Sequence, residues 1–187
     1  MASQPPVKLD FRAITVSGRV ASGATTVSRG LAKTLAWRLW NGGEIYRQYA
    51  REKNIPLERT DLSSDNYHLN LDKYIREKLK TENNLIMESW LSGYDARGIT
   101  DVFKIFIDCS NIALRIDRLV NREHMTIDQA KDHLKRREEE NLKKWYRLYG
   151  TREFWKRQYY DLVIDTYGYG PGETLKIVLK ELGFKKA

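Results

Sequence analysis

One stretch near the N-terminus decides the fold class, and it reads Gly18-Arg19-Val20-Ala21-Ser22-Gly23-Ala24-Thr25-Thr26. The residues before it, 11–17, are few and rich in β-branched side chains, which predicts a buried strand. The residues after it, 25–40, place Val27, Leu31 and Leu35 at helical spacing. The stretch is therefore expected to be a loop between a strand and a helix, and Asn41-Gly42-Gly43 is expected to end that helix.

Gly18 and Gly23 have the spacing of the phosphate loop G-x-x-x-x-G-K-[ST]. Glycines at these positions let backbone N–H groups converge on a phosphate, and the helix that follows presents its positive dipole end. Thr25 holds the hydroxyl position that ligates Mg²⁺ in such loops, but Ala24 stands where the lysine is expected. Arg19 is a candidate for supplying part of the missing charge, and a plain strand-to-helix turn remains the alternative.

Strands and helices alternate along the rest of the chain. Further strands are expected at 85–87, 102–107 and 162–166, and further helices at 45–53, 65–81, 111–122, 127–149 and 174–182. In the helix at 65–81 the inner positions are expected to be Leu69, Tyr74, Ile75 and Leu79. This alternation predicts an α/β fold with a parallel sheet flanked by helices on both faces. The length of 187 residues fits one domain, residues 1–187.

Composition limits the function classes. Hydrophobic residues make up 41% and charged residues 31% of the chain, and no apolar run approaches a membrane span of about 18 residues. Thirty-three Lys and Arg against 25 Asp and Glu give a net charge of +8, which favours a polyanionic partner such as a nucleotide or a nucleic acid. Cys109 is the single cysteine, and the first ten residues, with Pro5 and Pro6, are typical of a short unstructured lead-in rather than a secretory signal. We expect a cytoplasmic protein.

Several blocks in order, from Ala13 to Leu182, resemble the archaeal-type cytidylate kinases, a family of P-loop nucleoside monophosphate kinases. The family loop reads roughly G-P-P-G-S-G-T-T-T and also lacks the lysine, and the segment 22–26 is similar to its second half. The final segment 160–166 resembles the family's Y-D-L-V-I-N-T. The resemblance implies a three-layer α/β/α P-loop kinase fold with a helical lid, ATP and Mg²⁺ as cofactors, and transfer of the ATP γ-phosphate to CMP or dCMP.

Two further blocks carry the acceptor side of the resemblance. Gly43 to Arg47 is similar to G-x-I-[FY]-R, which implies that Arg47 holds the acceptor phosphate; a guanidinium binds phosphate bidentately. Residues 85–93 resemble V-L-E-G-R-L-A-G, so that Glu88 would organise Mg²⁺-bound water and Trp90 stands in place of an arginine. The alternatives are an exposed helix arginine, an ordinary strand-end carboxylate, and a tryptophan that packs or stacks on a base.

The acceptor side shows one more departure from the family. The segment Tyr67 to Asp72 is compared with I-D-x-x-L-D: Asp72 matches the second acid, while His68 replaces the first and is expected to be an exposed helix residue. The acceptor pocket is thus expected to involve Asp72, Glu88 and Trp90. No His/Cys cluster has the spacing of metal ligands, so we predict no zinc site.

The lid is implied by two arginine-bearing blocks. Residues 115–123 are similar to R-x-E-R-I-x-x-R-E, and residues 137–150 to R-E-x-x-x-x-x-R-Y-x-x-x-Y-G with a lysine in place of the second arginine. The resemblance implies a lid at roughly 118–150 between core parts 11–110 and 160–187, with four cations that neutralise the transferring phosphoryl group: Arg118, Arg122, Arg137 and Lys144. Residues 131–157 hold ten Lys or Arg and five Asp or Glu, a net +5 of the +8.

Three functions follow, in order of preference. The first is a monomeric nucleoside monophosphate kinase that uses ATP and a nucleotide acceptor and contacts no membrane. The second is a catalytically altered or inactive P-loop nucleotide-binding protein, or a kinase of a different small acceptor, because Ala24, His68, Trp90 and Lys144 all depart from the family pattern. The third, and the least favoured, is a nucleic-acid-binding module based on the aromatic and basic run at 145–160.

Overall fold

The protein is built on one parallel sheet. The computed structural model describes residues 7–184, so the segment with Pro5 and Pro6 lies outside the described residues. The sheet has five strands in the order β2-β3-β1-β4-β5, and each pairs in parallel with its neighbours. The strands are β1 (Ala13–Gly18), β2 (Arg38–Asn41), β3 (Leu85–Glu88), β4 (Val102–Asp108) and β5 (Leu162–Asp165). The sheet predicted from the sequence is confirmed, with β1 at its centre.

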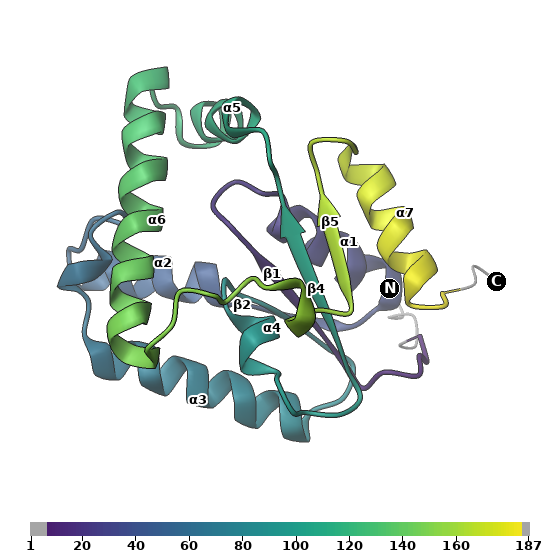
Figure 1. Ribbon diagram of the computed structural model, residues 1–187. Coiled ribbons are helices and arrows are strands. Elements are labelled where there is room, and N and C mark those ends of the chain that lie inside the picture. Colours follow the sequence, from purple (N-terminus) through teal and green to yellow (C-terminus); the bar gives the residue numbers. More distant parts are fainter. Residues whose placement is uncertain (1–6, 185–187) are drawn as a thin grey trace.

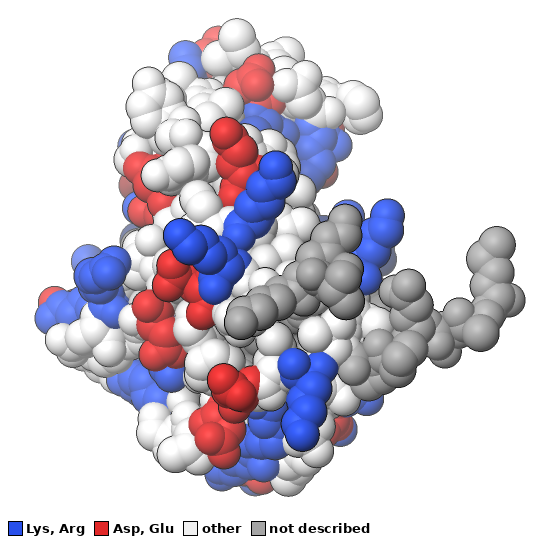
Figure 2. Space-filling view, turned by 90° about the vertical axis from the view of Figure 1, so that its right-hand side faces the viewer, with Lys and Arg blue, Asp and Glu red and all other residues white. Residues whose placement is uncertain are grey.

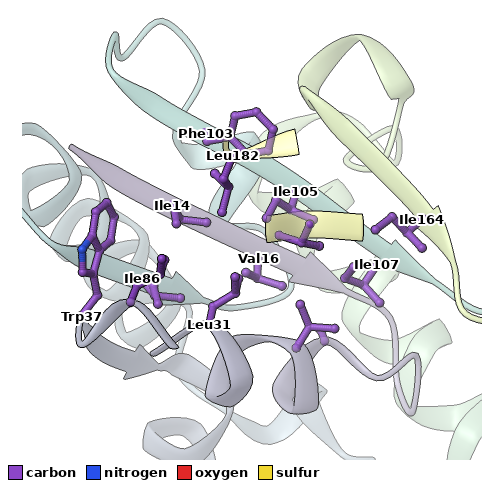
Figure 3. Packing of buried hydrophobic residues seen from close by; sticks show 14 residues of the cluster. Ile14, Val16, Leu31, Trp37, Ile86, Phe103, Ile105, Ile107, Ile164 and Leu182 are labelled. Carbon is purple, nitrogen blue, oxygen red and sulfur yellow. The ribbon is translucent and has the colours of Figure 1, made fainter. Parts of the chain in front are cut away.

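Helices cover both faces of the sheet. On one face, Ile14 and Val16 of β1 pack against α1 (Ala24–Leu35) and α7 (Pro171–Glu181) in the larger hydrophobic cluster, part of which Figure 3 shows. On the other face, Ala13 packs with residues of α3 (Asp65–Thr81), close to the short helix α4 (Ser92–Asp95). Because parallel strands are buried on both faces, β1 is apolar or small along its whole length.

The remaining helices lie toward the carboxyl ends of the strands. They are α2 (Gly42–Glu52), α5 (Ile112–Glu123) and α6 (Ile127–Tyr149), with short 3₁₀ turns at Thr60–Leu62 and Arg157–Tyr159. The long helix α6 stands apart from the sheet, with α5 against its first part (Figure 1). A capping box between Thr126 and Gln129 begins α6, and Gly150 ends it in the left-handed conformation that favours glycine. No helix in residues 7–184 is long and apolar enough to cross a membrane.

The structure corrects one helix boundary. The single helix expected at 25–40 ends at Leu35, because Ala36 adopts a left-handed conformation and the chain continues as edge strand β2. Trp37 turns inward between the two elements, and its Nε1 donates to the carbonyl oxygen of Val7 at 2.8 Å. Asn41 does not end a helix but begins one: its Oδ1 accepts from the backbone N–H of Glu44 at 2.8 Å and caps α2.

A second correction concerns α3. Ile75 and Leu79 are fully buried as expected, but Leu69 and Tyr74 are 42% and 43% exposed. The buried face of α3 instead includes His68, which the sequence placed on the surface.

Candidate functional site

The predicted phosphate loop joins β1 to the N-terminus of α1. Its backbone needs both glycines: Gly23 has a φ of +101°, and a Cβ on Gly18 would clash with the side chain of Ala24 at 2.6 Å. All nine residues from Gly18 to Thr26 line a cleft of about 710 Å³. The cleft therefore lies where the N–H groups of the first turn of α1 can bind an anion.

Arg118 of α5 holds the outer side of this loop. Its Nη1 donates to the carbonyl oxygens of Ala21 at 3.0 Å and Ser22 at 3.2 Å, and to Oγ1 of Thr166 at 3.0 Å. Thr166, directly after β5, also donates its hydroxyl to the Ser22 carbonyl at 2.8 Å. Arg118 lines the cleft, and its hydrogen bonds hold the loop carbonyls of Ala21 and Ser22.

Arg19 connects the loop to α6. Its Nη2 pairs with Oε2 of Glu138 at 2.9 Å, and its guanidinium lies 5.4 Å from the ring centroid of Trp155. The other oxygen of Glu138 pairs with Arg115, whose Nε donates to the carbonyl oxygen of Val20 at 2.8 Å. The positive charge of Arg19 therefore lies beside the loop and is already paired with a carboxylate of α6.

Thr25 and Glu88 form the polar pair on the opposite side of the loop. The hydroxyl of Thr25 donates to Oε1 of Glu88 at 3.3 Å, and Oε2 of Glu88 has no hydrogen-bond partner within the described part of the chain. Burial raises the pKa of Glu88 to about 7, although the hydrogen bond from Thr25 and the positive charge of Arg47 act in the opposite direction. A hydroxyl and a buried, unpartnered carboxylate oxygen facing a phosphate cleft fit Mg²⁺, which binds few protein ligands and keeps waters and phosphate oxygens.

Three arginines from three helices converge at the inner end of the cleft. Arg47, Arg122 and Arg137 all line it. Arg137 is 6% exposed, and burial, followed by the charges of Arg122 and Arg47, lowers its pKa to about 10. Its guanidinium lies 5.7 Å from the centroid of the Trp90 ring.

The charges in this cluster have few partners. Among residues 7–184, Arg47 and Arg137 form no ion pair with a carboxylate, and Arg122 pairs only with the adjacent Glu123. Arg137 is the buried member of the three, whereas Arg47 is half-buried and Arg122 is exposed. Burying the unpaired charge of Arg137 is costly, and the like charges nearby add to that cost. The arrangement is therefore that of an anion site: it becomes favourable when a polyanion enters.

A second cavity of about 60 Å³ opens beyond this cluster and shares Gly43, Trp90 and Arg137 with the cleft. Its inner end is lined by the predicted acceptor residue Asp72 and by His68. Burial raises the pKa of Asp72 to about 6, and the hydroxyl of Tyr149 donates to this carboxylate. The expectation that His68 is exposed is wrong: the residue is 7% exposed, because its ring turns toward the loop before α3.

The structure does not bring Lys144 to either cavity. This side chain of α6 is buried, and its Nζ donates to the carbonyl oxygen of Ser63 and, at 3.1 Å, to the Ser63 hydroxyl. Nζ also lies 3.4 Å from Oδ1 of Asp65. The remaining predicted site residues lie in the two cavities: the loop, Arg47, Arg118, Arg122, Arg137 and Glu88 in the cleft, Asp72 in the second cavity, and Trp90 in both.

Sequence reasoning missed two residues that position the loop. Glu138 lies inside the quoted Arg137-Glu138 block, and its ion pair with Arg19 joins residues far apart in the sequence. Thr166 ends the quoted last strand. A hydroxyl at the carboxyl edge of a parallel sheet, where ligands bind, is the sequence signal that could have marked Thr166 as part of the site. Neither role could be assigned without knowing which loops meet at that edge.

Comparison with known proteins places this site in a family. The model of the cytidylate kinase-like family matches residues 57–167, more than half of the chain. The chain belongs to the cytidylate kinase-like family. A cytidylate kinase of Pyrococcus abyssi is 32% identical over 168 residues, which cover 88% of this chain and 90% of the relative. The resemblance to this family, inferred from the sequence blocks, is confirmed. The expectation of a nucleotide-binding P-loop kinase, a class of transferase, is confirmed with it.

Solved structures support the fold of this family member. A gluconokinase of Sinorhizobium meliloti 1021 has a TM-score of 0.61 at 13% identity and covers 94% of both chains. A shikimate kinase of Acinetobacter baumannii in complex with shikimate has a TM-score of 0.55 at 16% identity and covers 95% of this chain and 96% of that one. The three-layer α/β/α P-loop kinase fold is therefore confirmed.

Proposed function

We propose that this protein is an ATP-dependent nucleoside monophosphate kinase that transfers the γ-phosphate of ATP to CMP or dCMP. The observation that carries the proposal is the cluster of Arg47, Arg122 and Arg137 in the phosphate-loop cleft, of which Arg137 also lines the second cavity. Phosphoryl transfer requires such a cluster at the point where donor and acceptor phosphates meet, because catalysis consists mostly of positioning and charge stabilisation.

ATP would occupy the cleft over the phosphate loop. The N–H groups of residues 18–26 would bind its β- and γ-phosphates, and the dipole of α1 would add positive potential. Thr25 and Glu88 would hold Mg²⁺, partly through water, and Mg²⁺ would neutralise charge on the β- and γ-phosphates. The clamp of Arg118 on the loop carbonyls would keep the loop open toward the phosphates without lysine at position 24.

The acceptor would enter through the second cavity. Arg47 would bind its phosphate, and an oxygen of that phosphate would attack the γ-phosphorus in line while the bond to the ADP oxygen breaks. No general base is needed, because a phosphate monoester is largely dianionic near neutral pH. Arg122 and Arg137 would stabilise charge on the transferring group. Arg122 and Arg137 belong to α5 and α6, the region 118–150 that we propose as the lid, whose closure would exclude water.

A second candidate is a nucleotide-binding protein without transfer activity. It is favoured by the ion pair between Arg19 and Glu138, because that pair occupies the one loop cation that could replace the missing lysine. The two candidates share the same binding geometry and differ only in turnover.

The nucleic-acid reading receives less support. In the aromatic run at 145–160, Trp145, Phe154 and Tyr160 are buried and pack with neighbouring rings instead of forming an exposed stacking surface. On the face drawn in Figure 2, acidic and basic side chains are interspersed. We therefore propose that much of the positive charge serves nucleotide phosphates.

A coupled assay of ADP formation with CMP, dCMP, UMP, AMP and GMP tests the proposal. We expect turnover to depend on the acceptor and to be fastest with CMP or dCMP. Arg47→Met should reduce kcat/KM for the acceptor by about 100-fold or more, because it removes a charge-assisted bidentate contact. A folded sample that binds ATP and CMP but turns over none of the five acceptors would exclude the kinase and leave the binding protein.

A further inference from the structure

The ring of His68 is held by a small network beneath the second cavity. Its Nε2 lies 2.7 Å from the hydroxyl oxygen of Ser63. That oxygen also lies 2.5 Å from the carbonyl oxygen of Thr60 and 3.1 Å from Nζ of Lys144. One serine hydroxyl thus has three hydrogen-bond partners.

The donors and acceptors in this network leave one arrangement. A hydroxyl carries a single hydrogen, and the Thr60 carbonyl can only accept, so the Ser63 hydrogen points to Thr60. The ammonium of Lys144 can only donate, and it takes one lone pair of the hydroxyl. His68 must then donate from Nε2 to the remaining lone pair, which fixes the Nε2–H tautomer and leaves Nδ1 without a proton.

His68 is held neutral in this position. Burial and the nearby charge of Lys144 together lower its pKa to about 4, although the charge of Asp65 acts in the opposite direction. In the neutral Nε2–H form, Nδ1 can only accept a hydrogen bond. Within residues 7–184 no donor contacts Nδ1, and His68 lines the second cavity whereas Ser63 does not. Nδ1 is therefore the polar ring atom that His68 can present to a ligand.

Asp72 lies one helical turn further along the same face of α3 and lines the same cavity. Its carboxylate is also an acceptor. Two acceptors in the lining of one small cavity suit a planar ligand that offers two N–H bonds from one primary amine.

We infer that His68 is a specificity-determining residue, whose Nδ1 accepts a hydrogen bond from the exocyclic amine of an aminopyrimidine nucleotide while Ser63 and Lys144 hold its tautomer. The inference rests on the proposed function in taking the second cavity as the acceptor site. A cavity of about 60 Å³ holds neither base without widening, and a pyrimidine needs less widening than the larger purine. Uracil would place a carbonyl oxygen against Nδ1, so that two acceptors face each other without a hydrogen.

The same network joins two departures from the family pattern. His68 stands in place of an acid and Lys144 in place of an arginine, and in the structure both contact the Ser63 hydroxyl. A carboxylate at position 68 would accept a hydrogen bond through either oxygen, whereas Nδ1 of a neutral histidine accepts only in the Nε2–H tautomer. Lys144 supplies the donor that selects it. Together, His68 and Lys144 keep a hydrogen-bond acceptor at position 68.

The test compares binding and turnover of CMP and UMP in the full chain. Two conservative variants separate the ring nitrogens: in His68→Asn the amide oxygen can take the place of Nδ1, whereas His68→Gln places its amide near Nε2 and leaves the Nδ1 position empty. We expect the wild-type protein to favour CMP, and His68→Gln to lose roughly 10- to 100-fold of the CMP/UMP ratio in both Kd and kcat/KM, since an unpaired buried group costs this much. His68→Asn should retain most of that ratio. Asn70→Gln, on the exposed face of α3, is the control and should not change it.

Failure of the inference and failure of the proposed function have different signatures. Binding of CMP and UMP is measured by calorimetry without ATP, so the CMP/UMP ratio tests His68 even if no acceptor is phosphorylated. Equal Kd values for CMP and UMP, or an unchanged ratio in His68→Gln, would overturn the role of His68. The ¹⁵N chemical shifts of the His68 ring report the tautomer of the unliganded protein directly: a protonated Nε2 supports the network, and a protonated Nδ1 overturns it.

Discussion

Replacing Arg137 by methionine should stabilise the unliganded protein while it impairs the proposed chemistry. The side chain is 6% exposed and has no carboxylate partner among the described residues. Burial and two neighbouring arginines lower its pKa to about 10. At neutral pH the guanidinium is charged in both the folded and the unfolded chain, so the whole cost of burying the charge weakens folding.

The expected size follows from that pKa. Each pKa unit corresponds to about 1.4 kcal/mol, so the buried charge of Arg137 costs roughly 3 kcal/mol. Methionine retains much of the aliphatic stem but loses the contact with the Trp90 ring, which is worth about 1 kcal/mol. We therefore expect Arg137→Met to raise the free energy of unfolding by about 2 kcal/mol.

Urea unfolding with and without nucleotides measures both effects. Without nucleotide, the unfolding midpoint of Arg137→Met should lie above that of the wild type, while ATP and CMP together should stabilise the variant less than the wild type. Arg136→Met, at the adjacent exposed position, is the matched control and should change neither quantity. A loss of several kcal/mol in the unliganded Arg137 variant would refute the reasoning, because it would show a guanidinium bound to protein groups rather than poised for an anion.

Three further predictions concern the surroundings of the site. Asp72→Asn should raise the free energy of unfolding by roughly 3 kcal/mol at about pH 8 and leave it unchanged near pH 3. Burial raises the pKa of Asp72 to about 6, so the cost of its charge appears only as the pH rises from the ordinary pKa of an aspartate through that value; a pH series of urea unfolding curves checks this, and a constant difference would contradict it. Glu138→Gln should lower the free energy of unfolding by roughly 1–3 kcal/mol and strengthen ATP binding, since it leaves the charges of Arg19 and Arg115 beside the phosphate loop uncompensated until a polyanion binds; unchanged or weaker ATP affinity in a calorimetric titration would count against that coupling. Gly93→Ala should cost roughly 1–3 kcal/mol in thermal unfolding, because the added Cβ meets the Tyr160 ring, and a stability equal to that of the wild type would show that the ring can move aside.

The sequence was sufficient for the parts of the fold whose signals are local. The phosphate loop, the buried strand before it and most helices follow from spacing and β-branched residues that act within a few positions. The edge strand β2 was missed because Leu35 and Leu39 happen to continue the helical spacing of α1. What ends that helix is the inward turn of Trp37 onto Val7, a contact between distant segments.

The residues of the site likewise divide into those with a local sequence signal and those whose place depends on contacts between distant segments. Arg47 and Glu88 follow a glycine pair and a buried strand, so their place at the carboxyl edge of the sheet could be expected. The burial of His68 and Lys144 depends on Ser63, which brings together the loop before α3 and the middle of α6. Because Lys144 resembles a solvated helix cation in the sequence, only the packing of α6 shows that it is buried against Ser63 and does not reach the phosphate cluster.

Direct observation of phosphoryl transfer tests the central claim. In a mixture of the protein, ATP, Mg²⁺ and CMP followed by ³¹P NMR, we expect the signals of CDP and ADP to grow together as those of ATP and CMP fall. Omission of CMP should stop the loss of ATP. Loss of ATP to ADP and inorganic phosphate without formation of CDP, or unchanged spectra with a protein that binds both nucleotides, would contradict the account.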